Sequence, residues 1–350
     1  MSFFKGISDR VSRRLFWCLL AAGALALVAG IVIFVLTGDS GYTVTTFSMG
    51  SYVQQTVYGG NREEGARAAA SAVAELENLI SWRVGNSDTA RLNEEAGREL
   101  IKIDPRTEQV LSSALAVCGA SGGAFDITIA PVSRLWDFDE NPHLPDSTLI
   151  EKFRDKVDFS GVALPGDGMA ALRYHEMALD LGAVGKGAAC DAAVEAYRES
   201  GVDRAVVAVG GSVGVYGEKP FGADWVIAVR DPAGGSLGTL KLQQGFVSTS
   251  GSYEKCFTEQ GKTYHHLLDP ATGYPAESGL VSVTVKSAEG VLSDGLSTAC
   301  FVLGLKKSLP VLAEFQAEAI FVTDRQVYVT KGLWEDFSMV AEGYELEKLE

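Results

Sequence analysis

An acidic residue and a hydroxyl residue four positions apart form a candidate metal site. Asp294 and Thr298 lie in the segment 293–303, which the sequence predicts to be a helix. A separation of four places both side chains on one helix face. Two hard oxygen ligands on one face suit Mg²⁺, which needs few protein ligands when phosphates and waters complete its shell. The structural alternative makes Asp294 an N-terminal helix residue and Thr298 a packed side chain.

A glycine-rich segment is a candidate phosphate site. Residues 180–187 read Asp-Leu-Gly-Ala-Val-Gly-Lys-Gly and run from a predicted strand into a predicted helix. The glycines let backbone N–H groups approach an anion, the helix N-terminus favours phosphate, and Lys186 adds a positive charge. The spacing matches neither the P-loop nor the dinucleotide-binding fingerprint. A tight turn before a helix explains the segment equally well.

Hydroxyls and histidines make a third group. Residues 247–253 carry three serines and a threonine, and two of the four histidines of the chain, His265 and His266, stand together. Adjacent residues on a strand point to opposite faces, so at most one of these histidines faces a given site. That one is a candidate general base. The alternative for the histidine is a packed core residue. The alternative for the hydroxyl-bearing residues 247–253 is a polar strand end and turn.

The remaining pattern predicts the elements that position these residues. Asn61 is predicted to cap a helix with apolar positions 69, 73, 76 and 80, Thr107 to cap a second helix, and residues 187–200 to form a third. Alternation predicts strands in the segments 47–58, 204–209, 225–229, 281–285, 320–323 and 327–330. Segregated helices and antiparallel hairpins indicate an α+β fold.

The N-terminus predicts a membrane anchor. Residues 15–36 are an unbroken apolar run, preceded by four basic residues and Asp9. About 20 apolar residues cross a bilayer as a helix, and the basic stub should stay in the cytoplasm. The run is longer than the apolar region of a cleaved signal peptide, which is the alternative.

Charge and cysteine usage exclude other classes. The chain has a formal net charge of −15, and its basic N-terminal stub makes the remainder still more acidic. Such a surface disfavours binding to nucleic acid or to anionic lipid. The five cysteines show no Cys-x-x-Cys spacing, which disfavours a zinc or redox site.

Together these motifs resemble the ApbE family of FAD:protein FMN transferases in order and spacing. The matching segments are 87–93, 123–131, 180–187, 248–254, 265–275 and 293–299, with the glycine pair 210–211, and the resemblance covers roughly residues 47–330. The chain departs from the family pattern at Ala183, where a glycine is usual, at Ser212, where asparagine is common, and at Arg83, where a tyrosine often packs on the flavin. The resemblance implies a T-fold-like core of antiparallel sheet and packed helices.

The resemblance also implies roles for individual residues. Asp294, Thr298 and the Ala183 carbonyl correspond to the metal ligands, and His266 corresponds to the catalytic base. The positions that correspond to contacts with the flavin nucleotide are Met49, Ala124, Phe125, Asp126, Asp180, Lys186 and Leu268.

The implied reaction is the Mg²⁺-dependent transfer of FMN from FAD, through a phosphodiester bond, to a Thr or Ser hydroxyl of an acceptor protein, with release of AMP. Hydrolysis of FAD to FMN and AMP is the enzymatic alternative, and an anchored flavin-binding protein is the non-enzymatic one. The implied acceptor is a flavin-carrying subunit of a membrane electron-transport complex or a secreted flavoprotein.

The predicted organisation therefore has five parts. They are a cytoplasmic stub (1–14), a single transmembrane segment (15–36), a linker (37–44), an extracytoplasmic catalytic domain (45–335) and an acidic C-terminal tail (336–350).

Overall fold

The computed structural model describes residues 40–350, and its folded unit runs from Tyr42 to Glu350. The predicted stub and transmembrane segment lie outside the described residues, as do residues 37–39 of the predicted linker. Within residues 40–350, none of the helices has the length and apolar character that a membrane span requires.

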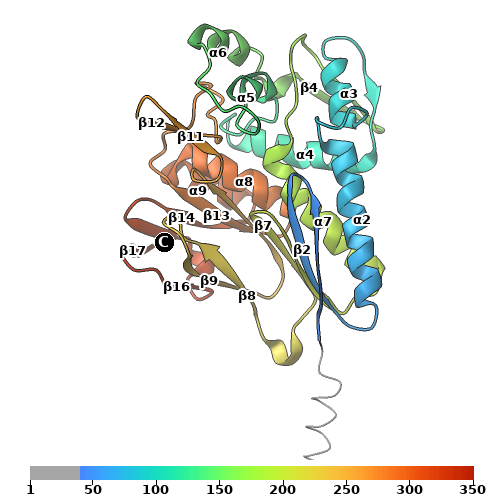
Figure 1. The fold of residues 1–350 in the computed structure, drawn as a ribbon, viewed down its shortest axis with the longest axis vertical. Helices are drawn as coiled ribbons and strands as arrows, with labels where there is room; N and C mark the ends of the chain where they lie inside the picture. The colour runs from blue at the N-terminus through green and yellow to red at the C-terminus, as the bar shows by residue number, and fades with distance from the viewer. Residues whose placement is uncertain (1–39) are drawn as a thin grey trace, which may run out of the picture. The chain divides into compact units, whose positions relative to one another are not determined.

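A nine-stranded sheet forms the centre of the fold (Figure 1). Its strands are, in spatial order, β1 (Tyr42–Ser48), β2 (Ser51–Tyr58), β6 (Arg204–Val209), β7 (Ser212–Tyr216), β10 (Gly245–Gly251), β13 (Ser282–Ser287), β14 (Glu318–Val322), β15 (Gln326–Val329) and β17 (Glu345–Lys348). Neighbouring strands are antiparallel except β15 and β17, which are parallel. The alternation read from the sequence matches one buried face on β2 and β6, whereas β13 and β14 are buried on both faces and β17 is exposed.

The α-helices of residues 40–350 are α2 (Arg62–Ile80), α3 (Asp88–Glu94), α4 (Pro105–Ala120), α5 (Ala130–Trp136), α6 (Ser147–Arg154), α7 (Gly182–Glu199), α8 (Gly290–Leu303) and α9 (Leu305–Glu314). Of these, α2, α7, α8 and α9 pack against strands of the central sheet. Helix α7 packs between α2 and α8, and α8 packs on β10 and β13 (Figure 1). The fold is α+β, as the sequence predicts.

Three small sheets complete the unit. The sheet of β8 (Trp225–Arg230), β9 (Ser236–Leu242) and β16 (Phe337–Met339) shares a hydrophobic core with β7, β10, β14 and β15. The other two consist of β3 (Ile101–Lys102), β5 (Met169–Leu172) and β4 (Val162–Gly166), and of β11 (Cys256–Glu259) with β12 (Lys262–His265).

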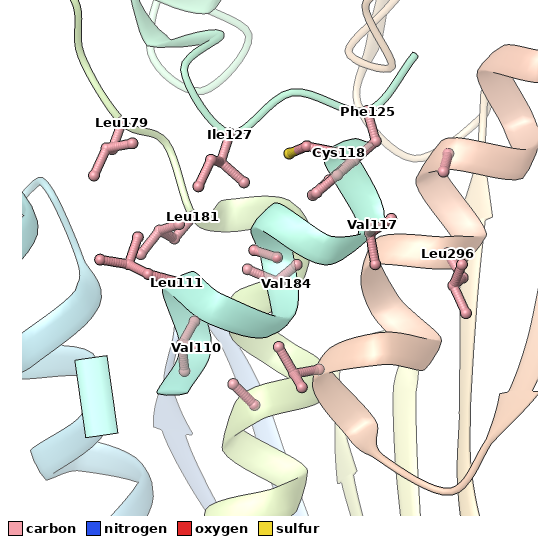
Figure 2. Packing of buried hydrophobic residues seen from close by; sticks show 14 of the residues in the cluster. Val110, Leu111, Val117, Cys118, Phe125, Ile127, Leu179, Leu181, Val184 and Leu296 are labelled. Carbon is pink, nitrogen blue, oxygen red and sulfur yellow. The ribbon is translucent and has the colours of Figure 1, made fainter. Parts of the chain in front are cut away.

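The largest hydrophobic cluster holds α4 against α7 and α8. Figure 2 shows Val117 and Phe125 packed beside Leu296 of α8, with Val184 of α7 close by. Burial of apolar side chains is the main stabilising contribution to such a fold. This cluster fixes the two helices that carry the candidate ligands Ala183, Asp294 and Thr298.

Several local predictions need correction. Residues 47–58 do not form one strand, because the chain turns at Met49 and Gly50, which both have positive φ, and β1 and β2 form a hairpin. Thr107 does not cap α4. Asp104 does so by accepting the Arg106 N–H at 2.9 Å, while Thr107 is buried and donates to Asp88.

Two helix starts and the C-terminus also differ from expectation. Asn61 occupies the N-cap position of α2, but its side chain donates to the Ser200 carbonyl and caps nothing. Helix α7 begins at Gly182, so the glycine-rich segment forms the first turns of the helix itself. The segment 336–350 is part of the folded unit, because β16 and β17 pair with β9 and β15.

Candidate active site

The site is organised by a backbone contact between α7 and α8. A Cβ atom added to Gly187 would lie 2.0 Å from the Gly290 carbonyl oxygen, and one added to Gly290 would lie 2.2 Å from the Gly187 carbonyl oxygen. Only glycine permits such a close approach. The contact therefore places the start of α8 directly against the second turn of α7.

Asp294 is held at this crossing. Its side chain is buried, the residue being 3% exposed, and its Oδ2 accepts the Gly187 N–H at 2.9 Å. Burial raises the pKa of Asp294, while the charge of Lys186 and hydrogen bonds from the Gly187 and Lys186 amides and from Ser212 oppose that rise. In residues 40–350 no basic side chain forms an ion pair with it. A buried carboxylate without an ion-pair partner is suited to a bound cation.

Thr298 and Ala183 supply further oxygen atoms near this carboxylate. Thr298 lies one turn after Asp294 on α8, as predicted, and its Oγ1 lies 3.1 Å from Ser250 Oγ. Ala183 is the second residue of α7, one turn before Gly187. The donor set of carboxylate, hydroxyl and carbonyl fits Mg²⁺, and no cluster of three or more His, Cys, Asp or Glu side chains competes for a metal within the described part of the chain. Because the protein supplies so few donors, phosphates and waters would complete the coordination shell of the ion.

Lys186 brings a positive charge to the same place. Its Nζ lies 3.4 Å from the Gly182 carbonyl, and its Cδ lies 3.1 Å from the Cβ position of Gly210, in the turn between β6 and β7. The glycine there lets the lysine stem pass close to the turn. Lys186 therefore extends from α7 along the end of the sheet where Met49 and Gly50 also turn.

Asp180 is positioned by backbone and side-chain contacts. Its two carboxylate oxygens accept the Gly182 N–H at 2.9 Å and the Ser133 hydroxyl at 3.2 Å. The preceding residue, Leu179, is held on both its backbone groups by the amide of Asn93. Asp180 thus binds the first amide of α7, at the end of the helix where an anion is stabilised.

The two adjacent histidines, His265 at the end of β12 and His266 just after it, point to different neighbours. The His265 ring packs edge-on against Phe301 of α8, with ring centroids 5.5 Å apart. The His266 ring faces Phe138 and is close to the charges of Lys255 and Lys186. Burial and those two charges lower the pKa of His266 to about 4, so the ring is neutral at physiological pH.

His266 has the properties of a base. Its backbone N–H donates to the Lys255 carbonyl at 3.0 Å, and its Nδ1 is buried with no hydrogen-bond partner. A neutral imidazole with an unpartnered nitrogen can accept a proton. The charge of Lys186 acts on both this ring and Asp294.

A charged loop lies beside His266. Asp139, next to Phe138, forms ion pairs with both Lys255 and Arg83. The guanidinium groups of Arg83 and Arg134 lie 4.2 Å and 4.5 Å from the Trp82 ring centroid. Arg83 therefore packs on Trp82 and binds Asp139.

The remaining predicted residues are spread around this centre. Met49, in the β1–β2 turn, packs against Gly185 of α7, its Sδ being 4.0 Å from the Cβ position. Phe125 is 3% exposed and belongs to the hydrophobic core, as Figure 2 shows, and Ala124 precedes it. Asp126 is buried and accepts hydrogen bonds from Thr128 and from the Phe159 amide. Leu268 packs in the cluster around Trp136, away from solvent.

The sequence pattern does not reveal the partners of two supporting groups. Asp191 of α7 accepts the Gly290 and Val291 N–H groups, each at 2.7 Å, and so caps α8 from a neighbouring helix. The serines of β10, Ser248 and Ser250, bond to hydroxyls on α8. Only the period-two spacing of these serines on a strand hints at a shared face.

Comparison with known proteins identifies the relatives of this arrangement. The family model described as "ApbE family" matches residues 49–321. The chain is similar to the FAD:protein FMN transferase of Treponema pallidum, with 31% identity over 292 residues that cover 78% of this chain and 81% of that one. It is also similar to an FAD:protein FMN transferase of Klebsiella pneumoniae, with 30% identity over 87% of this chain and 96% of that one.

Solved structures give the same result. The crystal structure of the ApbE protein from Thermotoga maritima aligns with a TM-score of 0.75 at 30% identity, over 81% of this chain and 94% of that one. The apo form of the flavinyl transferase ApbE from Pseudomonas stutzeri aligns with a TM-score of 0.73 at 27% identity, over 82% and 92%.

Proposed function

The chain belongs to the ApbE family and is an enzyme that transfers FMN from FAD to protein, and we propose that the crossing of α7 and α8 is its active site. The observation that carries this proposal is the contact of Gly187 with Gly290. It brings Asp294 to the Gly187 amide, with the charge of Lys186 acting on both Asp294 and His266.

Asp294, Thr298 and the Ala183 carbonyl are proposed to hold Mg²⁺. When bound, the ion would neutralise charge on the FAD pyrophosphate and on the AMP that leaves. Asp294 contributes the negative charge that the ion needs, and the charge of Lys186 and the Gly187 amide favour its ionised form against the effect of burial. Thr298 adds a neutral oxygen ligand on the same helix face.

The start of α7 is proposed to bind the phosphates. Helix N-termini stabilise anions through their free N–H groups and the helix dipole, and Lys186 adds a full charge. Asp180 keeps the first turn in place through its bond to the Gly182 amide. These groups fix the pyrophosphate so that one phosphorus faces the acceptor hydroxyl, which lowers the entropic part of the barrier.

His266 is proposed to take the proton from that hydroxyl. The hydroxyl oxygen then forms a bond to the phosphorus of the FMN half, while the bond from this phosphorus to the bridging oxygen breaks and AMP departs with that oxygen. A base must be unprotonated before the reaction, and the lowered pKa of His266 ensures this at neutral pH.

One assay separates this function from its alternatives. The protein is incubated with FAD, Mg²⁺ and an acceptor fragment, AMP is quantified, and flavin fluorescence is measured on the denatured acceptor. Transfer gives AMP and covalently labelled acceptor in equal amounts. AMP without labelled acceptor would identify a pyrophosphatase. If neither AMP nor labelled acceptor forms, the protein only binds flavin.

The place of action is also part of the proposal. The apolar run at residues 15–36 and the basic residues before it support a single-pass anchor with the catalytic unit outside the cytoplasm. The acceptor must then expose its Thr or Ser on that side, as a subunit of a membrane electron-transport complex or a secreted flavoprotein would. Tethering raises the effective concentration of the enzyme toward a membrane-bound acceptor.

A further inference from the structure

A buried chain of hydroxyl groups links strand β10 to helix α8. Ser250 Oγ lies 2.7 Å from Ser297 Oγ and 3.1 Å from Thr298 Oγ1. Ser297 Oγ in turn lies 2.8 Å from the backbone carbonyl oxygen of Asp294. Ser250 is 8% exposed and Ser297 is fully buried, so bulk water does not replace these contacts.

Counting protons gives this chain a direction. Each hydroxyl has one proton to donate, and a carbonyl can only accept. The proton of Ser297 must therefore go to the Asp294 carbonyl, so Ser297 accepts from Ser250. The single proton of Ser250 is then used, so Ser250 accepts from Thr298.

The consequence concerns the lone pairs of Thr298. Its proton points toward Ser250 on β10, so the lone pairs of Oγ1 point in other directions. A hydroxyl binds a cation through a lone pair, and a proton directed at the ion would oppose binding. The hydroxyl chain fixes the rotation that a ligand needs.

We propose that Ser250 is a positioning residue that orients the Thr298 hydroxyl as a cation ligand. The inference rests on the proposed role of Thr298 at the metal site and adds a residue that does not touch the ion. Residues that orient metal ligands typically change metal affinity 10- to 100-fold when they are removed. Ser250→Ala should therefore weaken cation binding by about 10-fold.

The experiment measures cation binding and needs no turnover. Mn²⁺ is titrated into the protein without FAD, and the free ion is followed by its EPR signal. The variants are Ser250→Ala, Ser250→Thr, which keeps a hydroxyl, and Thr298→Val alone and with Ser250→Ala. Asp294→Asn defines which binding belongs to this site.

Thr249→Val is the matched control. Thr249 lies between the two serines on β10 but faces the other way, and its Oγ1 pairs with Thr284 Oγ1 at 2.8 Å. Its substitution removes a hydroxyl from the same strand without touching the chain to Thr298. Unfolding midpoints in EDTA check that each variant is folded.

The expected result has four parts. Ser250→Ala weakens Mn²⁺ binding about 10-fold, Ser250→Thr restores most of it, and Thr249→Val leaves it unchanged. In the Thr298→Val background, Ser250→Ala has no further effect, because the two residues act through one contact.

Two results would overturn the proposal. One is wild-type Mn²⁺ affinity in folded Ser250→Ala. The other is a loss of Mn²⁺ affinity on Ser250→Ala that is equal in the wild type and in the Thr298→Val variant, that is, with and without the Thr298 hydroxyl. Failure of the proposed metal site itself is distinguishable, because Asp294→Asn would then bind Mn²⁺ as well as the wild type does.

Discussion

Alanine at position 187 should separate the two helices that form the site. The new Cβ would lie 2.0 Å from the Gly290 carbonyl oxygen and 2.7 Å from Asp294 Cβ, whereas Cβ contacts below 3.0 Å are essentially never seen. The helices must therefore move apart by about 1 Å, given the separation that packed atoms need. A shift of that size lengthens the 2.9 Å bond from the Gly187 amide to Asp294 beyond hydrogen-bond distance.

The cost follows from two contributions. Overpacking costs about 1–3 kcal/mol, and losing a hydrogen bond to a buried charged group costs about 1.5–3 kcal/mol. The higher helix propensity of alanine returns about 1 kcal/mol. We expect Gly187→Ala to lower the free energy of unfolding by about 2–5 kcal/mol in total.

Gly185→Ala is the matched control on the same helix. A Cβ there meets only Ile80 Cδ1 at 3.8 Å and Met49 Sδ at 4.0 Å, which are ordinary contacts. This variant should be as stable as the wild type or slightly more stable. Gly290→Ala, with a contact of 2.2 Å from the other helix, should behave as Gly187→Ala does.

The assay is urea unfolding followed by circular dichroism, together with the rate of FMN transfer by each folded variant. Displacement of a reacting group by about 1 Å costs on the order of 100-fold in rate, so residual transfer by Gly187→Ala should be slow even where the protein is folded. Unfolding of Gly187→Ala at the same urea concentration as Gly185→Ala would show that the contact between α7 and α8 does not require glycine at position 187.

Three further predictions concern the base, its pH dependence and the topology. His266→Ala should bind FAD in fluorescence titrations and fail to label the acceptor, while His265→Ala stays active. The reverse pattern would show that His265, and not His266, is the base. Because burial and two lysine charges lower the pKa of His266 to about 4, the acid limb of transfer should lie well below pH 6.5. The unfolded chain binds this proton first as pH falls, so stability should decrease by on the order of 2 kcal/mol between pH 7 and pH 5, and His266→Gln should remove that decrease in urea unfolding. Protease added to intact cells or spheroplasts should digest the chain after Asp39, and protection of that region until the cells are lysed would show that the topology is the opposite one. Truncation up to Gly38 should leave activity on a soluble acceptor fragment near normal.

The chemistry-bearing residues were accessible from the sequence because their order along the chain is diagnostic. Asp294 and Thr298 lie on one helix, as a spacing of four predicts, and the two histidines point to different neighbours, as strand geometry predicts. Local periodicity also predicted β2, β6, β13, β14 and β15 of the central sheet, but not β1, β7, β10 or β17. These features depend on neighbours in sequence.

Features that depend on distant contacts could not be predicted in the same way. The start of α7 at Gly182 depends on Asp180, and the first amides of α8 are bound by Asp191 from α7. A side chain supplied by another helix leaves no signature near the cap it makes. The hydroxyl chain from β10 to α8 likewise needs the tertiary packing to be known.

In the proposed function, the α7–α8 crossing transfers FMN to a protein hydroxyl with the help of Asp294. Asp294→Asn tests it most directly, because the amide can still accept the Gly187 N–H while the negative charge is lost. The measurement is the intact mass of the acceptor, with AMP quantified in the same reaction. We predict that the wild type increases the mass of the acceptor by one FMN less one water, at a Thr or Ser, and releases an equal amount of AMP, whereas the folded variant does neither. Full labelling by Asp294→Asn, or by the wild type in excess EDTA, would contradict the account.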